Sequence, residues 1–311
     1  MFNNKNIFIA LTYKCNAFCK KCMTRYHMNK DIEMSKPIID RIVFLLTEYS
    51  YKKLISVGTG EPLLYSNISY FISQVLDVNA DIKLRLLTNG MLLTNQNVSS
   101  VYNKRIKWGI TFDAFTQNSL EGFQKGVIIE KVKENVVSFV KCYGGENLYL
   151  NFTITSKNIS EVLPFCMFAI QNGINEIYLT ELKVFSSYEK DLEDYALQND
   201  YTLEREIDKV KEYLTSHNVS IDGINIGRKN DRRKCYIKNI SSPMIDVDGS
   251  VSFCSGREDE IIGNIFDKDI VVKWREYVKY IEDNNINWCE KCYDKKKQNG
   301  IYYLPNTIRR S

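Results

Sequence analysis

Three cysteines stand close together near the start of the chain, in the run Cys-Asn-Ala-Phe-Cys-Lys-Lys-Cys. Cys15, Cys19 and Cys22 therefore place three thiols on one short loop, directly after an apolar stretch that is typical of a strand. Three thiolates can hold three irons of a [4Fe–4S] cluster, and the fourth iron is then open to bind and reduce a small molecule. Zinc is the alternative, but structural zinc takes four ligands and His27 is the only imidazole nearby.

Four further cysteines lie in the last third of the chain, in a pattern that also suggests a metal site. Asp248 and Gly249 form the turn of a predicted β-hairpin, which leads directly to one of these cysteines. Four thiolates make a closed ligand set, which suits either zinc or an iron–sulfur cluster. The four residues are Cys235, Cys254, Cys289 and Cys292. We expect the two remaining cysteines, Cys142 and Cys166, to be buried small hydrophobes.

The composition is that of an ordinary globular enzyme. Of 311 residues, 44% are hydrophobic and 26% are charged, and the net charge is only +4. This balance argues against a nucleic-acid partner held by phosphate neutralisation. The sequence shows no secretory signal and no membrane-spanning run, and a chain of this length buries its own core without disulfides. We therefore expect a cytoplasmic protein with reduced thiols and no membrane partner.

Strand-like and helix-like runs alternate along the first 220 residues, which predicts a parallel sheet. We expect an α/β fold: an open, partial (β/α)6 TIM-like barrel over residues 1–225, then a small α+β domain of β-hairpin plus helix over residues 226–311. In such barrels the active site lies at the carboxyl ends of the strands, where the cysteine loop also falls. The predicted strands are 6–12, 53–57, 82–87, 106–112, 147–155 and 174–179, and the predicted helices are 34–49, 68–76, 95–102, 127–142, 160–172 and 203–217.

Polar and glycine-rich turns follow the predicted strands. The run Gly58-Thr59-Gly60-Glu61 follows the second strand, Asn89 the third and Asp113 the fourth. Glycines allow the backbone to approach a ligand closely, and a carboxylate can face an ammonium group. Each turn alone is weak evidence for a ligand site, but together, in this order after the cysteine loop, the turns form a recognisable pattern.

This pattern resembles the radical S-adenosylmethionine (SAM) superfamily over about the first 220 residues. The resemblance implies a SAM-binding [4Fe–4S] cluster on Cys15, Cys19 and Cys22, and SAM itself as cofactor. Two positions depart from the usual pattern. Lys21 stands where an aromatic ring often packs on the adenine, and Thr59 replaces a second glycine, which a backbone with negative φ would accommodate. The residues that match SAM-contacting positions of the family are Gly58, Thr59, Gly60, Glu61, Asn89, Asp113, Thr153 and Thr155.

The C-terminal cysteines look like those of the shortened auxiliary-cluster domain called twitch, a relative of the SPASM domain. The resemblance covers roughly residues 235–292. It implies one auxiliary iron–sulfur cluster, either [4Fe–4S] or [2Fe–2S], on Cys235, Cys254, Cys289 and Cys292. Spacing alone leaves zinc open at these four cysteines.

The family resemblance implies reductive cleavage of SAM to a 5′-deoxyadenosyl radical, which takes a hydrogen atom from a substrate. A flavodoxin- or ferredoxin-type protein would donate the electron. We expect the substrate to be a ribosomally synthesised peptide that is oxidised, crosslinked or epimerised. Alternatives are a small-molecule alcohol dehydrogenase of aminocyclitol type and a non-catalytic iron–sulfur or zinc scaffold. No catalytic side chain is assigned; Cys142 or Cys166 could donate hydrogen, and Glu181, Lys183 or Arg257 could act on an alcohol.

Overall fold

The computed structural model describes residues 6–22, 31–182, 192–197, 200–216, 243–252 and 261–283. Its centre is a curved sheet of six parallel strands, all of which overlap the strands expected from the sequence. Neighbours along the sheet are also consecutive among these six, as in one part of a (β/α) barrel. The strands are β1 (Ile7–Ile9), β3 (Leu54–Val57), β4 (Lys83–Thr88), β5 (Ile106–Phe112), β7 (Leu148–Ile154) and β8 (Ile177–Glu181).

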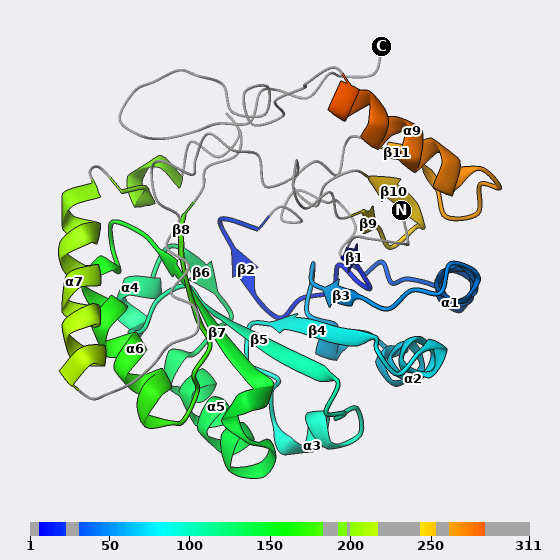
Figure 1. The fold of residues 1–311 in the computed structure, drawn as a ribbon. Helices are drawn as coiled ribbons and strands as arrows, with labels where there is room; N and C mark the ends of the chain where they lie inside the picture. The colour runs from blue at the N-terminus through cyan, green and yellow to red at the C-terminus, as the bar shows by residue number, and fades with distance from the viewer. Residues whose placement is uncertain are drawn as a thin grey trace.

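Helices connect these strands and lie on the outer side of the curved sheet (Figure 1). Parallel neighbours need such crossovers, and an amphipathic helix supplies one that also covers the sheet. Three-residue 3₁₀ turns cover Pro62–Leu64, Gly145–Asn147 and Ile159–Glu161. The helices are α1 (Lys36–Glu48), α2 (Ile68–Val78), α3 (Asn95–Ser99), α4 (Gln117–Leu120), α5 (Ile129–Tyr143), α6 (Val162–Gln171) and α7 (Asp200–Ser216).

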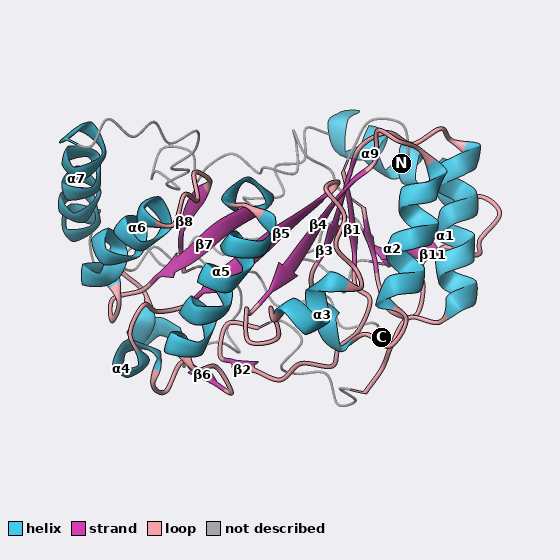
Figure 2. Cartoon of the chain, turned by 90° about the horizontal axis from the view of Figure 1, so that it is seen from below, coloured by secondary structure: helices cyan, strands magenta, loops and turns pink. Residues whose placement is uncertain are grey.

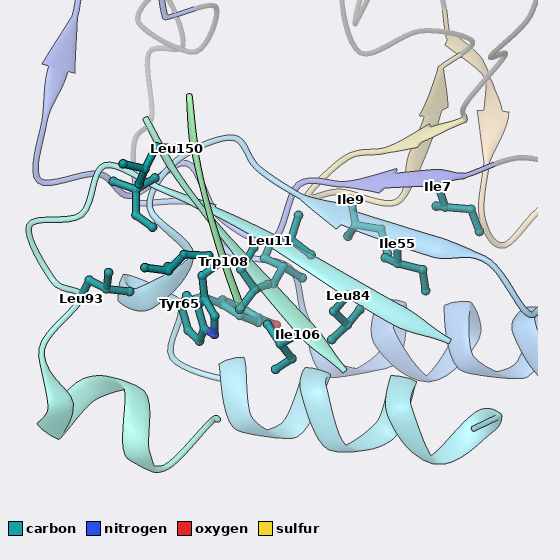
Figure 3. Close-up of a cluster of buried hydrophobic side chains, with 14 of the residues drawn as sticks. Ile7, Ile9, Leu11, Ile55, Tyr65, Leu84, Leu93, Ile106, Trp108 and Leu150 are labelled. Atoms are coloured by element: carbon teal, nitrogen blue, oxygen red, sulfur yellow. The ribbon is translucent and has the colours of Figure 1, made fainter. Parts of the chain in front are cut away.

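The hydrophobic core fills the space between the sheet and these helices. Ile55, Leu84 and Trp108 have no exposed surface, and in Figure 3 Ile55 and Leu84 lie between the strands and the helices. Alternate strand residues such as Ser56 and Arg85 are only half-buried and belong to the opposite, inner face of the sheet. The outer face therefore stabilises the fold, and the inner face and strand ends are left for function.

The described part of the C-terminal third extends the same sheet. Strand β9 (Met244–Ile245) pairs in parallel with β1, and β10 (Ser250–Ser252) and β11 (Ile261–Asn264) continue antiparallel. The expected hairpin turn is confirmed, with Gly249 at φ +83°, and helix α9 (Ile270–Asp283) follows. The proposed boundary near residue 225 and all four C-terminal cysteines lie outside the described residues.

The predicted α/β class and partial barrel are confirmed, but one prediction about a core residue is wrong. Cys166 is fully buried as expected, whereas Cys142 is exposed. Tyr143 rather than Cys142 continues the buried face of α5, since its ring stacks on Tyr102 at 4.3 Å. Within the described ranges, no helix combines the length and apolar character needed to cross a membrane.

Candidate functional site

The three-cysteine loop leaves the end of β1 and carries a two-residue strand, β2 (Phe18–Cys19). Strand β2 pairs antiparallel with β6 (Gln124–Lys125), and this ribbon lies beyond the arrowhead ends of the sheet strands (Figure 2). Cys15 is exposed and Cys19 and Cys22 are half-buried, and the Cys22 amide donates to the Cys19 carbonyl at 3.1 Å. The loop is thus placed where a barrel active site is expected.

The segment 122–126 supports this loop, and the sequence analysis missed it. Gln124 Nε2 donates a hydrogen bond to the Cys19 sulfur at 2.8 Å, and the Lys20 amide donates to the Phe123 carbonyl at 2.9 Å. Gly126 has φ +81°, and a Cβ there would lie 2.2 Å from the Asn16 carbonyl oxygen. The sequence feature that could have indicated this segment is the pair of glycines in Gly-Phe-Gln-Lys-Gly, since glycine often stands where two backbone segments approach closely.

The donor set fits an iron–sulfur cluster better than a single ion. Partial burial raises the pKa of the Cys19 thiol, so a bound metal must displace its proton. Cys22 lies close enough to interact electrostatically with the thiols of Cys15 and Cys19. Among the described residues, no three Cys, His, Asp or Glu side chains converge to hold one metal ion. A cubane cluster does not require the three thiolates to converge on a single point, because each of three irons takes a separate thiolate.

The glycine-rich turn after β3 is clamped against the base of the cysteine loop. Gly60 has φ +66°, and a Cβ there would lie 2.3 Å from the Thr12 carbonyl oxygen. The Glu61 amide donates to the Lys14 carbonyl at 2.7 Å. The turn and the cysteine loop therefore form one unit.

The Glu61 side chain points into the protein, and so its geometry differs from the expected carboxylate facing an ammonium group. It has no exposed surface and accepts hydrogen bonds from the Thr88 hydroxyl at 2.8 Å and from the Asn89 amide at 3.0 Å. Burial raises its pKa to about 7. Glu61 therefore joins the ends of β3 and β4, and the backbone of Gly58 to Gly60 is the part of the turn left for a ligand.

The expectation of negative φ at Thr59 is wrong. Its φ is +76°, in the left-handed region that disfavours a β-branched residue. The adjacent Gly60 and the two hydrogen bonds to Glu61 hold the turn in this form. Thr59 thus adopts a backbone conformation that glycine takes readily, at a cost in strain.

The remaining predicted SAM-contacting residues gather at neighbouring strand ends. Asn89 Nδ2 donates to Asn16 Oδ1 at 2.8 Å and lies 3.9 Å from the Cys15 sulfur. Asp113 and Thr153, after β5 and within β7, both contact the Lys21 ammonium. Thr155 is different, since its hydroxyl accepts from the Lys157 amide at 3.2 Å within the turn that follows β7.

A family model described as the radical SAM superfamily matches residues 9–141, from β1 through the cysteine loop to α5. The chain carries a radical SAM domain. Residues 9–141 thus form the domain of radical SAM enzymes, and such a domain takes a [4Fe–4S] cluster and SAM. The structure brings the cysteine loop, the Gly58–Glu61 turn and Asn89 together in this domain.

The chain is similar to several known proteins. A probable GTP 3′,8-cyclase from Sulfurisphaera tokodaii is 24% identical over 254 residues, covering 81% of this chain and 76% of the relative. Among solved structures, SuiB of Streptococcus suis bound to the precursor peptide SuiA has a TM-score of 0.69 at 18% identity, covering 88% of this chain and 65% of SuiB. The structure of anSMEcpe with AdoMet and the Cp18Cys peptide has a TM-score of 0.68 at 18% identity, covering 96% and 92%. These structural likenesses show the fold.

Candidate groups for the substrate chemistry are only partly described. Cys166 is buried in α6 on the helix-covered side of the sheet, and Cys142 is exposed at the end of α5, so neither is at the strand ends. Glu181 ends β8, whereas Lys183 and Arg257 lie outside the described residues. The hydrogen donor and the base stay unassigned.

Proposed function

We propose that the chain cleaves SAM reductively and uses the resulting radical to modify a peptide. Cys15, Cys19 and Cys22 would hold the SAM-binding cluster, and the backbone of Gly58 to Gly60 would receive the methionyl end of SAM. With the cluster bound, an electron from a flavodoxin- or ferredoxin-type donor splits SAM into methionine and a 5′-deoxyadenosyl radical, which takes a hydrogen atom from the substrate. The clamping of the cysteine loop on the glycine turn is the observation that carries this proposal.

The protein's own residues would position SAM and keep other reactants away. Gly60 and Glu61 hold the glycine turn against the cysteine loop. One bound ligand would then contact both segments at the same time. Asn89, Asp113, Thr153 and Thr155 are proposed as the polar groups along the same strand ends. Such a radical attacks any available hydrogen donor, so residues that fill the mouth of the barrel would keep water and other donors away.

The peptide substrate is supported by two structural neighbours whose complexes contain peptides, SuiB with SuiA and anSMEcpe with Cp18Cys. A nucleotide is the second candidate, because the Sulfurisphaera tokodaii relative is named as a probable GTP 3′,8-cyclase. We further propose one auxiliary iron–sulfur cluster on Cys235, Cys254, Cys289 and Cys292 in a twitch-like domain over residues 226–311. Oxygen-sensitive thiolate ligands suit a reducing compartment, and so we place the enzyme in the cytoplasm.

The test is 5′-deoxyadenosine formation by anaerobically reconstituted enzyme under dithionite. We expect slow formation without substrate and faster formation with a peptide encoded beside this gene. A variant with all three of Cys15, Cys19 and Cys22 changed to Ala is the control and should form none. Acceleration by GTP and not by the peptide would replace the peptide with the nucleotide, and no 5′-deoxyadenosine from the wild type would refute both.

A further inference from the structure

The Lys21 side chain links the cysteine loop to the ends of two sheet strands. Its ammonium contacts the Asp113 carboxylate after β5 and the Thr153 hydroxyl in β7. The Lys21 side chain is 24% exposed and that of Asp113 is 1% exposed, so this ion pair is largely removed from water. It joins segments about a hundred residues apart, which a solvent-exposed ion pair would not hold firmly.

The two partners of Lys21 are themselves fixed by a buried amide. Asn158 has no exposed surface, and its Nδ2 donates to the carbonyl oxygens of Asp113 and Thr153, both at 2.8 Å. Its Oδ1 accepts from the Thr155 amide at 2.7 Å. Asn158 thus holds three predicted SAM-contacting residues in one arrangement, and Lys21 connects that arrangement to the cysteine loop.

The two charges of this ion pair lie near one proposed ligand of the cluster, Cys19. Lys21 follows Cys19 by two residues in the chain, so its ion pair with Asp113 brings that carboxylate toward a proposed cluster ligand. A carboxylate beside thiolate ligands would repel them in this poorly solvated place. Lys21 supplies the opposite charge, and its removal would leave Asp113 buried and unpaired.

We propose that Lys21 is a positioning residue of the radical SAM site, whose ammonium holds the Asp113 carboxylate and the Thr153 hydroxyl toward SAM and balances charge beside Cys19. This inference rests on the proposed function, since the cluster and SAM are what Lys21 positions. Lys21 therefore influences two measurable properties, the affinity for SAM and the reduction potential of the cluster. Positive charge near a cluster favours its reduced form.

The experiment compares three variants of the full chain after anaerobic reconstitution. Lys21→Met keeps the length of the side chain without its charge, and Lys21→Arg restores a charged donor. Lys20→Met is the matched control, because Lys20 is the neighbouring residue of equal charge but its ammonium lies 5.1 Å from the centre of the Tyr195 ring. The readouts are the dissociation constant of SAM and the potential of the cluster, followed by electron paramagnetic resonance (EPR).

We expect Lys21→Met to weaken SAM binding roughly tenfold and to make the potential more negative, because a buried carboxylate loses its partner. Lys21→Arg should recover most of both properties. Lys20→Met should change SAM affinity by less than about twofold, because the half-buried Lys20 side chain faces the Tyr195 ring and not Asp113. If Lys21→Met does not fold, Lys21→Gln takes its place with the same expectations.

Two results would overturn the inference while leaving the proposed function intact. One is a Lys21→Met enzyme that equals the wild type in SAM affinity and in potential. The other is an equal shift in Lys20→Met, which would show that overall charge and not the contact with Asp113 matters. A wild type that takes up no cluster would instead refute the proposed function, and this inference with it, before any variant is compared.

Discussion

At the scale of single residues, buried polar side chains bind the site together. Three of them form hydrogen bonds with segments that carry proposed cofactor contacts, namely Glu61, Asn158 and Gln124. Buried polar groups are costly when unpaired, so each of these residues makes its segment's position specific. Changes at these residues should therefore alter both stability and cofactor binding.

Glu61 should make the stability of the cluster-free protein depend on pH. Burial raises the pKa of Glu61 in the folded state from 4.5 to about 7. Its contribution to the free energy of unfolding is therefore complete below pH 4.5 and is lost as the pH rises to 7. Relative to Glu61→Gln, the wild type should lose about 3 kcal/mol of unfolding free energy between pH 4.5 and 7, at about 1.4 kcal/mol per pH unit. Denaturant titrations at both pH values measure this, and parallel curves for the two proteins would contradict it.

Gln124 should stabilise the cluster through its hydrogen bond to the Cys19 sulfur. Loss of an outer partner of a metal ligand typically costs 10–100-fold in metal affinity or activity, so we expect Gln124→Leu to lower cluster retention by at least roughly tenfold. Iron content after gel filtration measures retention. Gln96→Leu, on the exposed surface of α3, is the control and should retain iron like the wild type. Equal retention in both variants would show that the Gln124 hydrogen bond is unimportant.

At the scale of elements, close backbone contacts join the loops that follow different strands. The Gly58–Glu61 turn meets residues 12–14 without any room for a side chain at Gly60. The segment 122–126 meets the cysteine loop in a similar way, where Gly126 lies against Asn16. These contacts make the separate loops one rigid support.

Gly60→Ala should be more damaging than the same change at another glycine of similar conformation. Gly173 has φ +70°, and no atom lies within 4 Å of the position that a Cβ would take there, so Gly173→Ala adds only left-handed strain of about 1–2 kcal/mol. Gly60→Ala adds a clash with backbone oxygen to the same strain, and we expect a larger loss of stability together with loss of SAM binding. Thermal unfolding and SAM titration measure both. Equal losses in the two variants would show that the contact with Thr12 carries no function.

The sequence predicted the large elements well because they bury regular apolar patterns. All six barrel strands and the longer helices were expected, and β5 matches its predicted range. The four-residue helix α4 was not expected. Strands β2 and β6 were missed because each has two residues and depends on its distant partner, a contact that local pattern cannot reveal.

The candidate site was predictable in its residues but not in their orientation. The cysteine spacing and the strand-end positions identified the loops that the structure brings together. The inward direction of Glu61, the positive φ of Thr59 and the Lys21–Asp113 contact depend on tertiary packing, and so the sequence could not show them. Gln124 and Asn158 were missed for the same reason.

At the scale of the whole molecule, one sheet joins the radical SAM domain to the described C-terminal strands. Strand β9 pairs with β1, the strand that leads into the cysteine loop, and Arg41 Nε of α1 donates to the Ile265 carbonyl at 3.1 Å. The hairpin that precedes Cys254 is thus attached to the barrel edge nearest the first cluster loop.

The most direct test of the account is the iron and sulfide content of anaerobically reconstituted protein, with EPR in the presence and absence of SAM. The wild type is compared with the variant in which Cys15, Cys19 and Cys22 are all Ala. We predict two clusters in the wild type, one in the variant, and a SAM-dependent change of the signal only in the wild type. A wild type with no cluster, or a variant whose signal still responds to SAM, would contradict the central claim that these three cysteines hold the SAM-binding cluster.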